Sequence, residues 1–498
     1  MSLQSKLFVA PGKAFAFNPA TPALIAVFAG IVGVFVYQYG LLAMLGAVLF
    51  LFLLAWMFGR PEATTLIILF VIYSNLAVVA VHYHGAPEIV SVGFFLLLGL
   101  PLVHRLVVQR KKAVFNPVFF LMLGYLVIML AAGIFSQDAG RSLVRVIGYL
   151  CEGVILYFLI VNAIQTQAML RKAIWAVLAA GILMGSITLY QSLTDSYDRS
   201  FGGLAQLSNT VINTGEGGGG GEEEGQFRLA GPIGEQNRYA QIMLVLLPLA
   251  VSCALNERRR ALRILALLSC IPILAGVLLT FSRGAFLSVL LMLAFMIYLQ
   301  RLKLRYVFLA LFSAVSFVFV AMPEYVYRIA TVSRMSSLAS GQFRTVDSSV
   351  RGRATENLAA LNIFLDHPLL GVGPGQTSQY MEEYGNKLGI KRLESTRRAH
   401  NMYLEESADN GIFGFICFMA IVLVTMRQLA AVRRYWLPRR PDLASIAAGF
   451  LLAIIGYLTS GLFLHLSYQR YYWLLLALAG AAVHVLQPEK SAKPKPSE

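Results

Sequence analysis

The sequence predicts an all-α membrane protein that crosses the bilayer many times and carries one large helical loop on its outer face. Hydrophobic residues make up 58% of the 498-residue chain and charged residues only 13%, whereas soluble chains carry about 25% charged residues. Apolar runs of bilayer-spanning length recur from Pro22 almost to the C-terminus. A β-barrel would show short alternating segments instead. These observations exclude a soluble enzyme, a disulfide scaffold, a disordered hub and an outer-membrane barrel.

About 14 apolar runs are predicted to be membrane spans, because each approaches the length that a helix needs to cross the hydrocarbon core. They are centred on residues 22–38, 40–58, 64–81, 89–104, 117–135, 146–163, 172–192, 238–255, 261–281, 284–300, 306–322, 409–426, 443–462 and 471–486. The chain is thus divided into an N-terminal bundle at 1–193, a loop at 194–237, central helices at 238–322, a large loop at 323–408, C-terminal helices at 409–486 and a tail at 487–498. The tract Gly215–Gly225 in the first loop predicts a flexible acidic tip.

Clusters of Lys and Arg between the runs fix the predicted orientation, and they hold most of the basic residues behind the formal net charge of +16. Under the positive-inside rule, the short connections that carry these clusters face the cytoplasm. The clusters are Arg105/Arg110/Lys111/Lys112, Arg258/Arg259/Arg260/Arg263, Arg301/Lys303/Arg305 and Arg427/Arg433/Arg434/Arg439/Arg440. Because the predicted number of spans is even, both termini join that side, and the loops at 194–237 and 323–408 face outward. The positive charge therefore indicates topology, and no nucleic-acid partner is expected.

Several kinds of chemistry lack their sequence signatures. The four cysteines lie inside apolar runs without metal-ligand spacing, which is typical of buried hydrophobic side chains. No H-E-x-x-H pattern, Walker loop or Gly-rich nucleotide fold is present, so neither a metal nor a cofactor is expected. The adjacent Glu382 and Glu383 would point about 100° apart on a helix and could not clamp one ion. The energy for any reaction must therefore come from an activated substrate or a gradient.

The large outer loop at 323–408 carries many basic residues. The positive-inside rule does not forbid this, because it applies to short loops and not to long translocated ones. The basic residues are Arg328, Arg334, Arg344, Arg351, Arg353, Lys387, Lys391, Arg392, Arg397 and Arg398. This excess of positive charge predicts an anionic ligand at the outer face. The alternative is a general attraction to anionic lipid headgroups.

Within this loop, the pattern of Arg353–Asp366 predicts an amphipathic helix, and the proline and glycines of His367–Gly375 end it. Arg351 and Arg353 stand at the expected start of that helix, where the helix dipole disfavours a cation. A bound anion removes this penalty, because backbone N–H groups and guanidinium groups then both point at it. We therefore expect a phosphate site at this helix start.

Polar residues also gather at three span ends on the outer face, within Arg228–Arg238, Ser282–Ala285 and Arg397–Glu405. Arg283 lies in a tight turn between two apolar runs, where a charge is costly unless it has a partner or a ligand. The alternative is that its side chain extends to the headgroups. His400 stands among basic residues, whose charge favours its neutral, proton-accepting form. The alternative is a structural role, which we also expect for the other histidines.

Taken together, these residues resemble the O-antigen ligase and O-antigen polymerase superfamily. The motifs are Ser282–Ala285, then Arg353 fourteen residues before His367–Gly373, then His400–Leu404 followed by Gly411. The resemblance is clearest from about Arg228 to Gly414. It rests on the order, the spacing and the shared outward side of the motifs, because each one is short.

The resemblance implies a metal-independent glycosyltransferase on the periplasmic face of the bacterial inner membrane. Members of this superfamily take a glycan from an undecaprenyl-pyrophosphate carrier and transfer it to an acceptor sugar hydroxyl. Arg283 and Arg353 match the arginines that hold the pyrophosphate. His400 matches the histidine that acts as base or orients the acceptor. In-line displacement would invert the anomeric carbon.

Other residues near these motifs are expected to bind the pyrophosphate or the glycan. Arg228 matches a less constant arginine of the superfamily, and Arg351 is a neighbour that could replace Arg353. Arg398 and Asn401 flank His400. The partners implied are the undecaprenyl-pyrophosphate-linked glycan, an acceptor glycan or lipid A-core, membrane lipids and a chain-length regulator.

The sequence leaves the product of the reaction open. The predicted number of spans and the Glu/Gly-rich loop favour a polymerase of O-antigen or exopolysaccharide units over a lipid A-core ligase, and transfer to a protein is a further alternative. A second class of function is a transporter or flippase for an anionic or lipid-linked substrate. Transporters place ionisable residues inside their spans, whereas most charges here lie at span ends on one face. This placement favours chemistry on a single side of the membrane.

Overall fold

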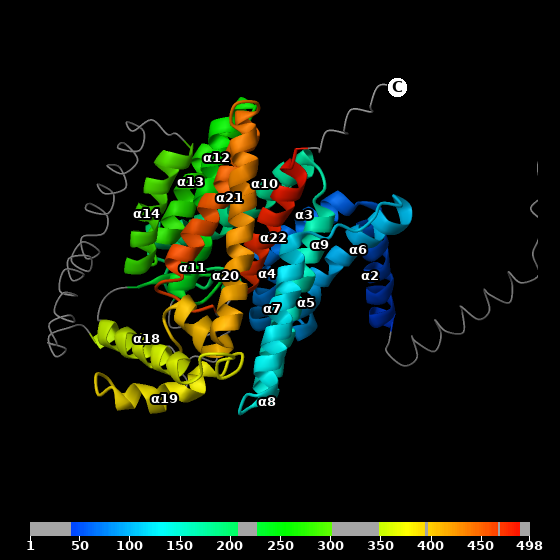
Figure 1. The fold of residues 1–498 in the computed structure, drawn as a ribbon. Helices are drawn as coiled ribbons and strands as arrows, with labels where there is room; N and C mark the ends of the chain where they lie inside the picture. The colour runs from blue at the N-terminus through cyan, green and yellow to red at the C-terminus, as the bar shows by residue number, and fades with distance from the viewer. Residues whose placement is uncertain (1–40, 208–226, 301–347, 394–396, 467–468, 489–498) are drawn as a thin grey trace, which may run out of the picture. The chain divides into compact units, whose positions relative to one another are not determined.

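The computed structural model describes residues 41–207, 227–300, 348–393, 397–466 and 469–488 (Figure 1). The chain divides into two compact units, Met1–Arg60 and Pro61–Glu498. In the first unit, α2 (Leu41–Gly59) is an apolar helix with no charged residue in its first or last turn. The predicted spans at 22–38 and 306–322 and the predicted acidic tip lie outside the described residues.

The second unit is mostly helical. Its first half consists of α3 (Pro61–Tyr73), α4 (Leu76–His84), α5 (Glu88–Gly93), η1 (Phe94–Leu98), α6 (Gly99–Val103), η2 (His104–Val108), α7 (Pro117–Ile134), α8 (Ala139–Tyr149), η3 (Leu150–Ile155), α9 (Leu156–Ala163), α10 (Gln167–Leu193) and η4 (Phe201–Gly203). Its second half consists of α11 (Gln236–Leu244), α12 (Leu246–Asn256), α13 (Arg260–Leu278), α14 (Arg283–Gln300), α18 (Ser348–Asp366), α19 (Thr377–Lys387), α20 (Met402–Trp436), α21 (Pro441–Ser460) and α22 (Gln469–Leu486). Two short strands, β1 (Gln206–Leu207) and β2 (Leu229–Gly231), pair antiparallel.

Seven helical segments among the described residues are long and apolar enough to cross a membrane. They are Pro117–Ile134, Ala139–Ala163, Gln167–Leu193, Gln236–Asn256, Arg260–Leu278, Met402–Trp436 and Pro441–Ser460. The predicted all-α, multi-pass architecture is therefore confirmed. The number of about 14 spans, which follows from the apolar run lengths, and the domain boundaries drawn between them stay predictions.

Two predicted spans are interrupted in the structure. The run at 64–81 breaks between α3 and α4, where Asn75 adopts a left-handed backbone conformation with φ of 62°. The run at 89–104 is divided among α5, η1 and α6. It contains Gly93, Gly99 and Pro101, which have the lowest helix propensities. Hydropathy alone does not detect such breaks, because the interrupted runs are still apolar.

Close packing of helices builds the core of the second unit. α10 packs against α13, α13 against α12, and α12 against α21. At one crossing, a Cβ atom on Gly185 of α10 would overlap the backbone carbonyl of Pro272 in α13. Glycine permits this approach, as is common where helices meet in membranes.

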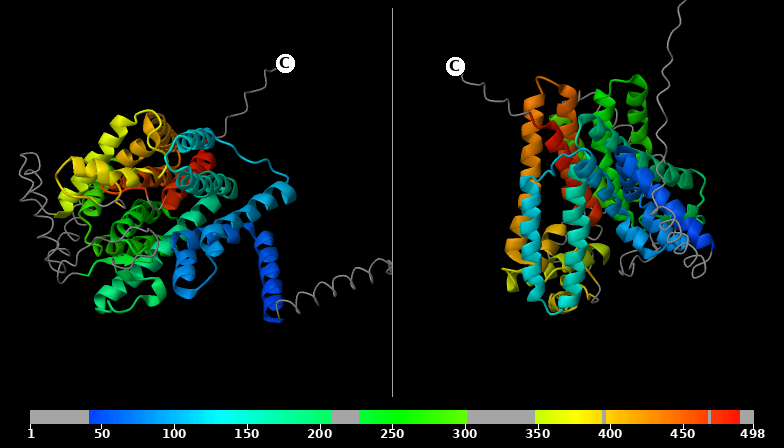
Figure 2. Two further views of the ribbon diagram at one scale, coloured as in Figure 1. Left: turned by 90° about the horizontal axis from the view of Figure 1, so that it is seen from below. Right: turned by 90° about the vertical axis from the view of Figure 1, so that its right-hand side faces the viewer.

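Helices α18 and α19 form a small layer at one end of α20 (Figures 1 and 2). They enclose a separate hydrophobic cluster that includes Ala359, Ile363, Val372 and Met381. Part of the large outer loop thus folds around an apolar core of its own. α20 has 35 residues, so at about 1.5 Å per residue it is longer than the roughly 30 Å hydrocarbon core requires. Its N-terminal turns can therefore support this layer.

The layer is joined to α20 at a kink. Gly411 has φ of 63° and ψ of −169° inside the helix, which releases the carbonyl groups before it from the helical pattern. The backbone N–H groups of Val372 and Gly373 donate hydrogen bonds to the carbonyls of Ala408 and Asp409, both at 2.9 Å. The predicted proline- and glycine-containing turn after α18 is therefore docked into the kink.

The expected start of the helix at Arg353 is wrong. α18 already includes Ser348, so Arg351 and Arg353 lie in its first two turns. The apolar pattern that locates the buried face does not extend to the polar residues before Arg353, which explains the late predicted start. The backbone N–H group of Arg353 is inside the helix, and the dipole argument does not apply to that residue.

Candidate active site

His400 lies directly before α20, and the start of that helix fixes its position. Asn401 is the N-cap, because its Oδ1 accepts hydrogen bonds from the backbone N–H groups of Tyr403 at 2.9 Å and Leu404 at 3.2 Å. Such a cap satisfies N–H groups that the first helical turn leaves without partners. The side chain of Asn401, which the sequence suggests as a substrate contact, therefore serves the helix that presents His400.

The imidazole of His400 contacts a buried carboxylate on α18. Its Nδ1 lies 2.6 Å from Oε2 of Glu356, and Nη1 of Arg397 lies 3.3 Å from Oε1 of the same residue. The Glu356 side chain is 1% exposed, whereas that of His400 is 25% exposed. A buried carboxylate needs such partners to remain charged. One nitrogen of His400 is thus held by the protein while part of the ring reaches solvent.

A second histidine lies beside the first, on the loop between α21 and α22. The rings of His400 and His465 meet edge to face, with centroids 5.7 Å apart. Burial, followed by the positive charges of Arg398 and Arg238, lowers the pKa of His465 well below its usual range. Burial and these charges therefore favour the neutral form of His465.

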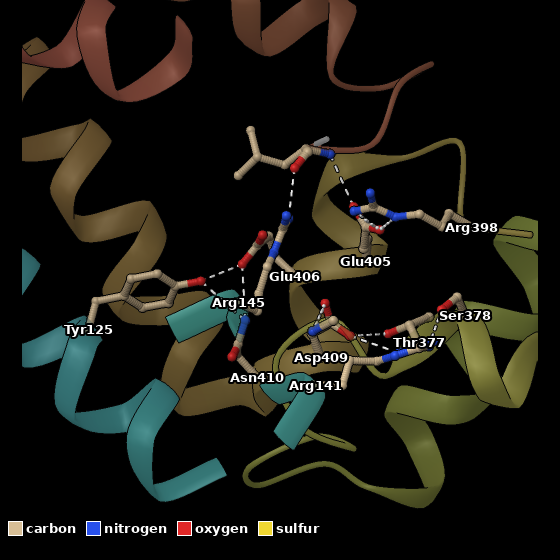
Figure 3. A network of polar contacts seen from close by, with 12 residues as sticks. Tyr125, Arg141, Arg145, Thr377, Ser378, Arg398, Glu405, Glu406, Asp409 and Asn410 are labelled. Carbon is tan, nitrogen blue, oxygen red and sulfur yellow. Dashed lines mark hydrogen bonds and ion pairs between the residues drawn. The ribbon is translucent and has the colours of Figure 1, made fainter. Parts of the chain in front are cut away.

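This loop is held in place by a polar network that Figure 3 shows from close by. The backbone N–H group of Leu466 donates to Oε2 of Glu405 at 3.0 Å, and Nη2 of Arg145 donates to the Leu466 carbonyl at 2.7 Å. Nη2 of Arg398 pairs with Oε1 of Glu405 at 2.5 Å. Arg398, predicted to bind substrate, therefore fixes the position of the loop through Glu405.

Two helices carry an arginine in their first turn at this end of the bundle. Arg283 is the first residue of α14, and the backbone N–H group of Ala285 donates to Oγ of Ser282 at 3.3 Å. Arg238 lies in the first turn of α11, where its backbone N–H group donates to the capping Glu235 at 2.7 Å. A cation in the first turn opposes the helix dipole. The argument for a bound anion therefore applies to Arg283 and Arg238, which lie where the sequence analysis did not apply it.

Both of these helix starts border the loop that carries His465. A Cβ atom on Gly284, next to Arg283, would lie 3.0 Å from Cβ of Phe463. Arg238 is only 3% exposed, and within the described residues nothing accepts a hydrogen bond from its Nη2. A buried guanidinium with an unused donor is suited to an anionic ligand.

The remaining predicted arginines lie on either side of this region. Nε of Arg228 donates to the carbonyl of Thr280 at 3.1 Å, which ties the start of β2 to the turn before Arg283. Arg353 lies one turn before Glu356 on α18, so the two side chains share a helix face. Nε of Arg351 is buried and has no hydrogen-bond partner in the described part of the chain.

Comparison with known proteins finds a family match in this region. Residues 265–419 match the O-antigen ligase family. The predicted resemblance to the O-antigen ligase and polymerase superfamily is confirmed by this match. The matched range contains Arg283, Arg351, Arg353 and His400. No curated protein sequence matches the chain.

Three residues of this site are not among those that the sequence analysis selects. Glu356 follows Arg353 by three positions, and that spacing on a helix could have indicated it. Arg238 closes the polar segment Arg228–Arg238 at a span end, and a charge at that position could have indicated it. His465 carried no local signal, because its contact with His400 joins residues from two different loops. Among the described residues, no group of three or more His, Cys, Asp or Glu side chains is placed to hold a metal ion.

Proposed function

We propose that the protein is a glycosyltransferase on the periplasmic face of the bacterial inner membrane. It moves a glycan from undecaprenyl pyrophosphate to the hydroxyl group of an acceptor sugar. The observation that carries this proposal is the position of His400 beside a loop that two arginine-bearing helix starts border. The match of residues 265–419 to the O-antigen ligase family supports the same reaction.

In this scheme the arginines bind the diphosphate and stabilise it as it leaves. The C1–O bond to the diphosphate breaks, and its electron pair remains on the diphosphate oxygen. Guanidinium groups at Arg238, Arg283 and Arg353 offset the charge that develops there, and one such donor contributes about 3 kcal/mol to a typical reaction. Arg228 and Arg351 support the same pyrophosphate site. The protein's own cations thus do the work that a metal ion performs in other phosphate sites.

His400 acts on the acceptor. The acceptor oxygen forms the new bond to C1 while its proton passes to Nε2 of His400, since Nδ1 is held by Glu356. A positioned base of this kind accelerates reactions by about 10²–10⁴-fold. The oxygen attacks opposite the leaving diphosphate, so the product is inverted at C1.

The acceptor distinguishes two versions of the proposal. A polymerase would add repeat units to a growing carrier-linked glycan, together with a chain-length regulator. A ligase would transfer the glycan to lipid A-core. The printed family description, O-antigen ligase, favours ligation, whereas the predicted number of spans favours polymerisation.

The test is transfer by the purified protein in nanodiscs. The donor is an undecaprenyl-pyrophosphate-linked repeat unit, offered with and without lipid A-core, and products are read by mass spectrometry. We expect product with the wild type and at least a 100-fold lower rate with His400→Ala or Arg353→Ala. A ladder of carrier-linked glycans identifies a polymerase, and product only with lipid A-core identifies a ligase.

Two matched variants control for general effects of substitution. His367→Ala removes an exposed histidine, and Arg392→Ala removes an exposed arginine of the same outer loop. Both should retain wild-type rates. Activity that survives His400→Ala, or no product at all with a native repeat unit, would refute the proposed chemistry and favour transport of a lipid-linked substrate.

A further inference from the structure

The contact between His400 and Glu356 joins two helices that are distant in the sequence. The residues are 44 positions apart, and they lie on α18 and immediately before α20. The separation between Nδ1 and Oε2 is 2.6 Å, which is short for a hydrogen bond between a nitrogen and an oxygen and indicates a charge-assisted one. The pair is therefore a strong contact at the point where the layer of α18 and α19 meets the start of α20.

The carboxylate of Glu356 is oriented by its second partner. Its Oε1 lies 3.3 Å from Nη1 of Arg397, so each oxygen has one nitrogen partner. The side chain is 1% exposed, and water competes little for either oxygen. Such a carboxylate has little freedom to rotate away from His400.

This arrangement decides which nitrogen of His400 carries the proton. A carboxylate accepts hydrogen bonds, so Nδ1 of the neutral ring must be the protonated nitrogen. The lone pair then lies on Nε2, at the opposite side of the ring. When Nε2 receives a proton, the resulting imidazolium faces a fixed negative charge, which stabilises it.

The other charged or titratable groups around His400 are already engaged or neutral. Arg398 is paired with Glu405 at 2.5 Å. The neutral form of His465 is favoured, because burial and nearby cations oppose its protonation. Arg397 shares Glu356 with His400. Glu356 is thus the carboxylate whose charge acts directly on the imidazole.

We propose that Glu356 is the positioning residue of His400, which holds the imidazole with Nε2 available and stabilises its protonated form. This inference rests on the proposed function for its catalytic meaning. In the transfer step, the acceptor proton moves to Nε2, the acceptor oxygen bonds to C1, and the diphosphate departs with the electron pair. Glu356 stays ionised throughout and takes no proton.

The test begins with a measurement that needs no activity. Exchange of the imidazole C2 hydrogen for deuterium, followed by peptide mass spectrometry of the full chain in nanodiscs, titrates each histidine separately. Replacing Glu356 by glutamine removes the charge and keeps the shape. We expect the exchange profile of His400 to change in this variant, because Glu356 contacts the His400 ring directly. His367, which is exposed, serves as the reference in the same spectra.

The second measurement is catalytic. Glu356→Gln should lower kcat by about 10²-fold or more while the KM for the donor changes little, because the lost interaction acts in the transition state. Glu356→Asp keeps the charge and should retain an exchange profile near that of the wild type, with a smaller loss in kcat. Glu383→Gln removes an exposed carboxylate of α19 and should change neither quantity.

The outcomes separate this inference from the proposed function. An unchanged His400 exchange profile in Glu356→Gln overturns the role of Glu356, whatever the enzyme transfers. If the His400 profile changes in Glu356→Gln but the wild type makes no product, the pairing is supported and the proposed reaction is refuted. If the glutamine variant does not fold, the comparison of Glu356→Asp with the wild type decides: a loss of kcat as large as that of His400→Ala contradicts a charge-based role.

Discussion

At the scale of single residues, Arg238 is the most costly feature of the site. Its guanidinium is buried in the first turn of a helix, and no carboxylate among the described residues pairs with it. Burying a charge without a partner costs several kcal/mol in general. A folded chain tolerates that cost where the charge has a use, as in a site for an anionic ligand.

Arg238 offers a test in which stability and activity move in opposite directions. Arg238→Met keeps most of the side-chain volume and removes the charge, so we expect the free energy of unfolding to rise by about 1–4 kcal/mol. Loss of one charge-stabilising donor should lower kcat by about 10²–10³-fold. Denaturant unfolding in detergent and the transfer assay measure the two effects. Arg238→Lys, which keeps the charge, should leave stability near wild type. A methionine variant that is less stable and fully active would contradict this role.

The sequence could predict only part of the site at this scale. Arg283, Arg353 and His400 stand in short motifs, and their charge in an outward-facing position is a local signal. Glu356 and His465 acquire their roles through contacts with His400 that span 44 and 65 positions. No periodicity or local charge pattern encodes such contacts, so their partners become visible only in the folded chain.

At the scale of elements, the docking of one turn into a kinked helix sets the geometry of the centre. Gly411 interrupts α20, and the backbone N–H group of Ile412 donates to the carbonyl of Pro368 at 2.8 Å. This junction fixes the end of α18 against α20, and α18 carries Glu356 toward His400. The proline- and glycine-rich composition predicts the turn itself. Its docking partner could not be predicted, because the hydrogen bonds join segments that are distant in the sequence.

Substitution at this kink should loosen the centre without touching a catalytic group. Gly411→Ala places a side chain at φ of 63° and ψ of −169°, and its Cβ would overlap the carbonyl of Leu369. Backbone strain of this kind costs about 1–3 kcal/mol, and the overlap adds to it. We expect a lower midpoint of thermal unfolding and a lower kcat. Gly389→Ala is the matched control: its φ is also positive, at 66°, but nothing lies within 4 Å of the added Cβ. An equal loss in the two variants would show that strain alone, without the docking contact, explains the effect.

At the scale of the whole molecule, the predicted orientation assigns each helix end to one side of the membrane. This assignment can be compared with the helix ends that are in contact in the structure. The contacts of the site join the starts of α11, α14 and α20 with the loop that follows α21. The predicted alternation of spans places all of these ends on the outer face. Hydropathy predicts the helical, multi-pass architecture, because each span must match the apolar lipid around it. Hydropathy does not detect the breaks in α3–α4 and α5–α6, since the interrupted runs are still apolar.

The orientation can be measured with single cysteines in a variant that lacks the four native ones. Glu382→Cys on α19 is exposed and is predicted to face the periplasm, and Lys111→Cys in the loop before α7 is exposed and is predicted to face the cytoplasm. A membrane-impermeant maleimide should label the first in cells with a permeable outer membrane, and the second only after the inner membrane is opened. The reverse pattern would place the centre on the wrong side for a periplasmic reaction.

The cap formed by Asn401 has a consequence for how mutational surveys of this protein are understood. An alanine at this position would loosen the start of α20 and lower the rate of transfer. Asn401 and His400 would then look like members of one catalytic group. The side-chain oxygen of Asn401, however, accepts hydrogen bonds from backbone N–H groups in the first turn of α20. Serine or aspartate, which also cap helices well, should restore what alanine removes, whereas no such exchange can restore the imidazole. Whether a chemically similar side chain restores activity, more than how much activity alanine removes, distinguishes the residues that position this centre from those that react in it.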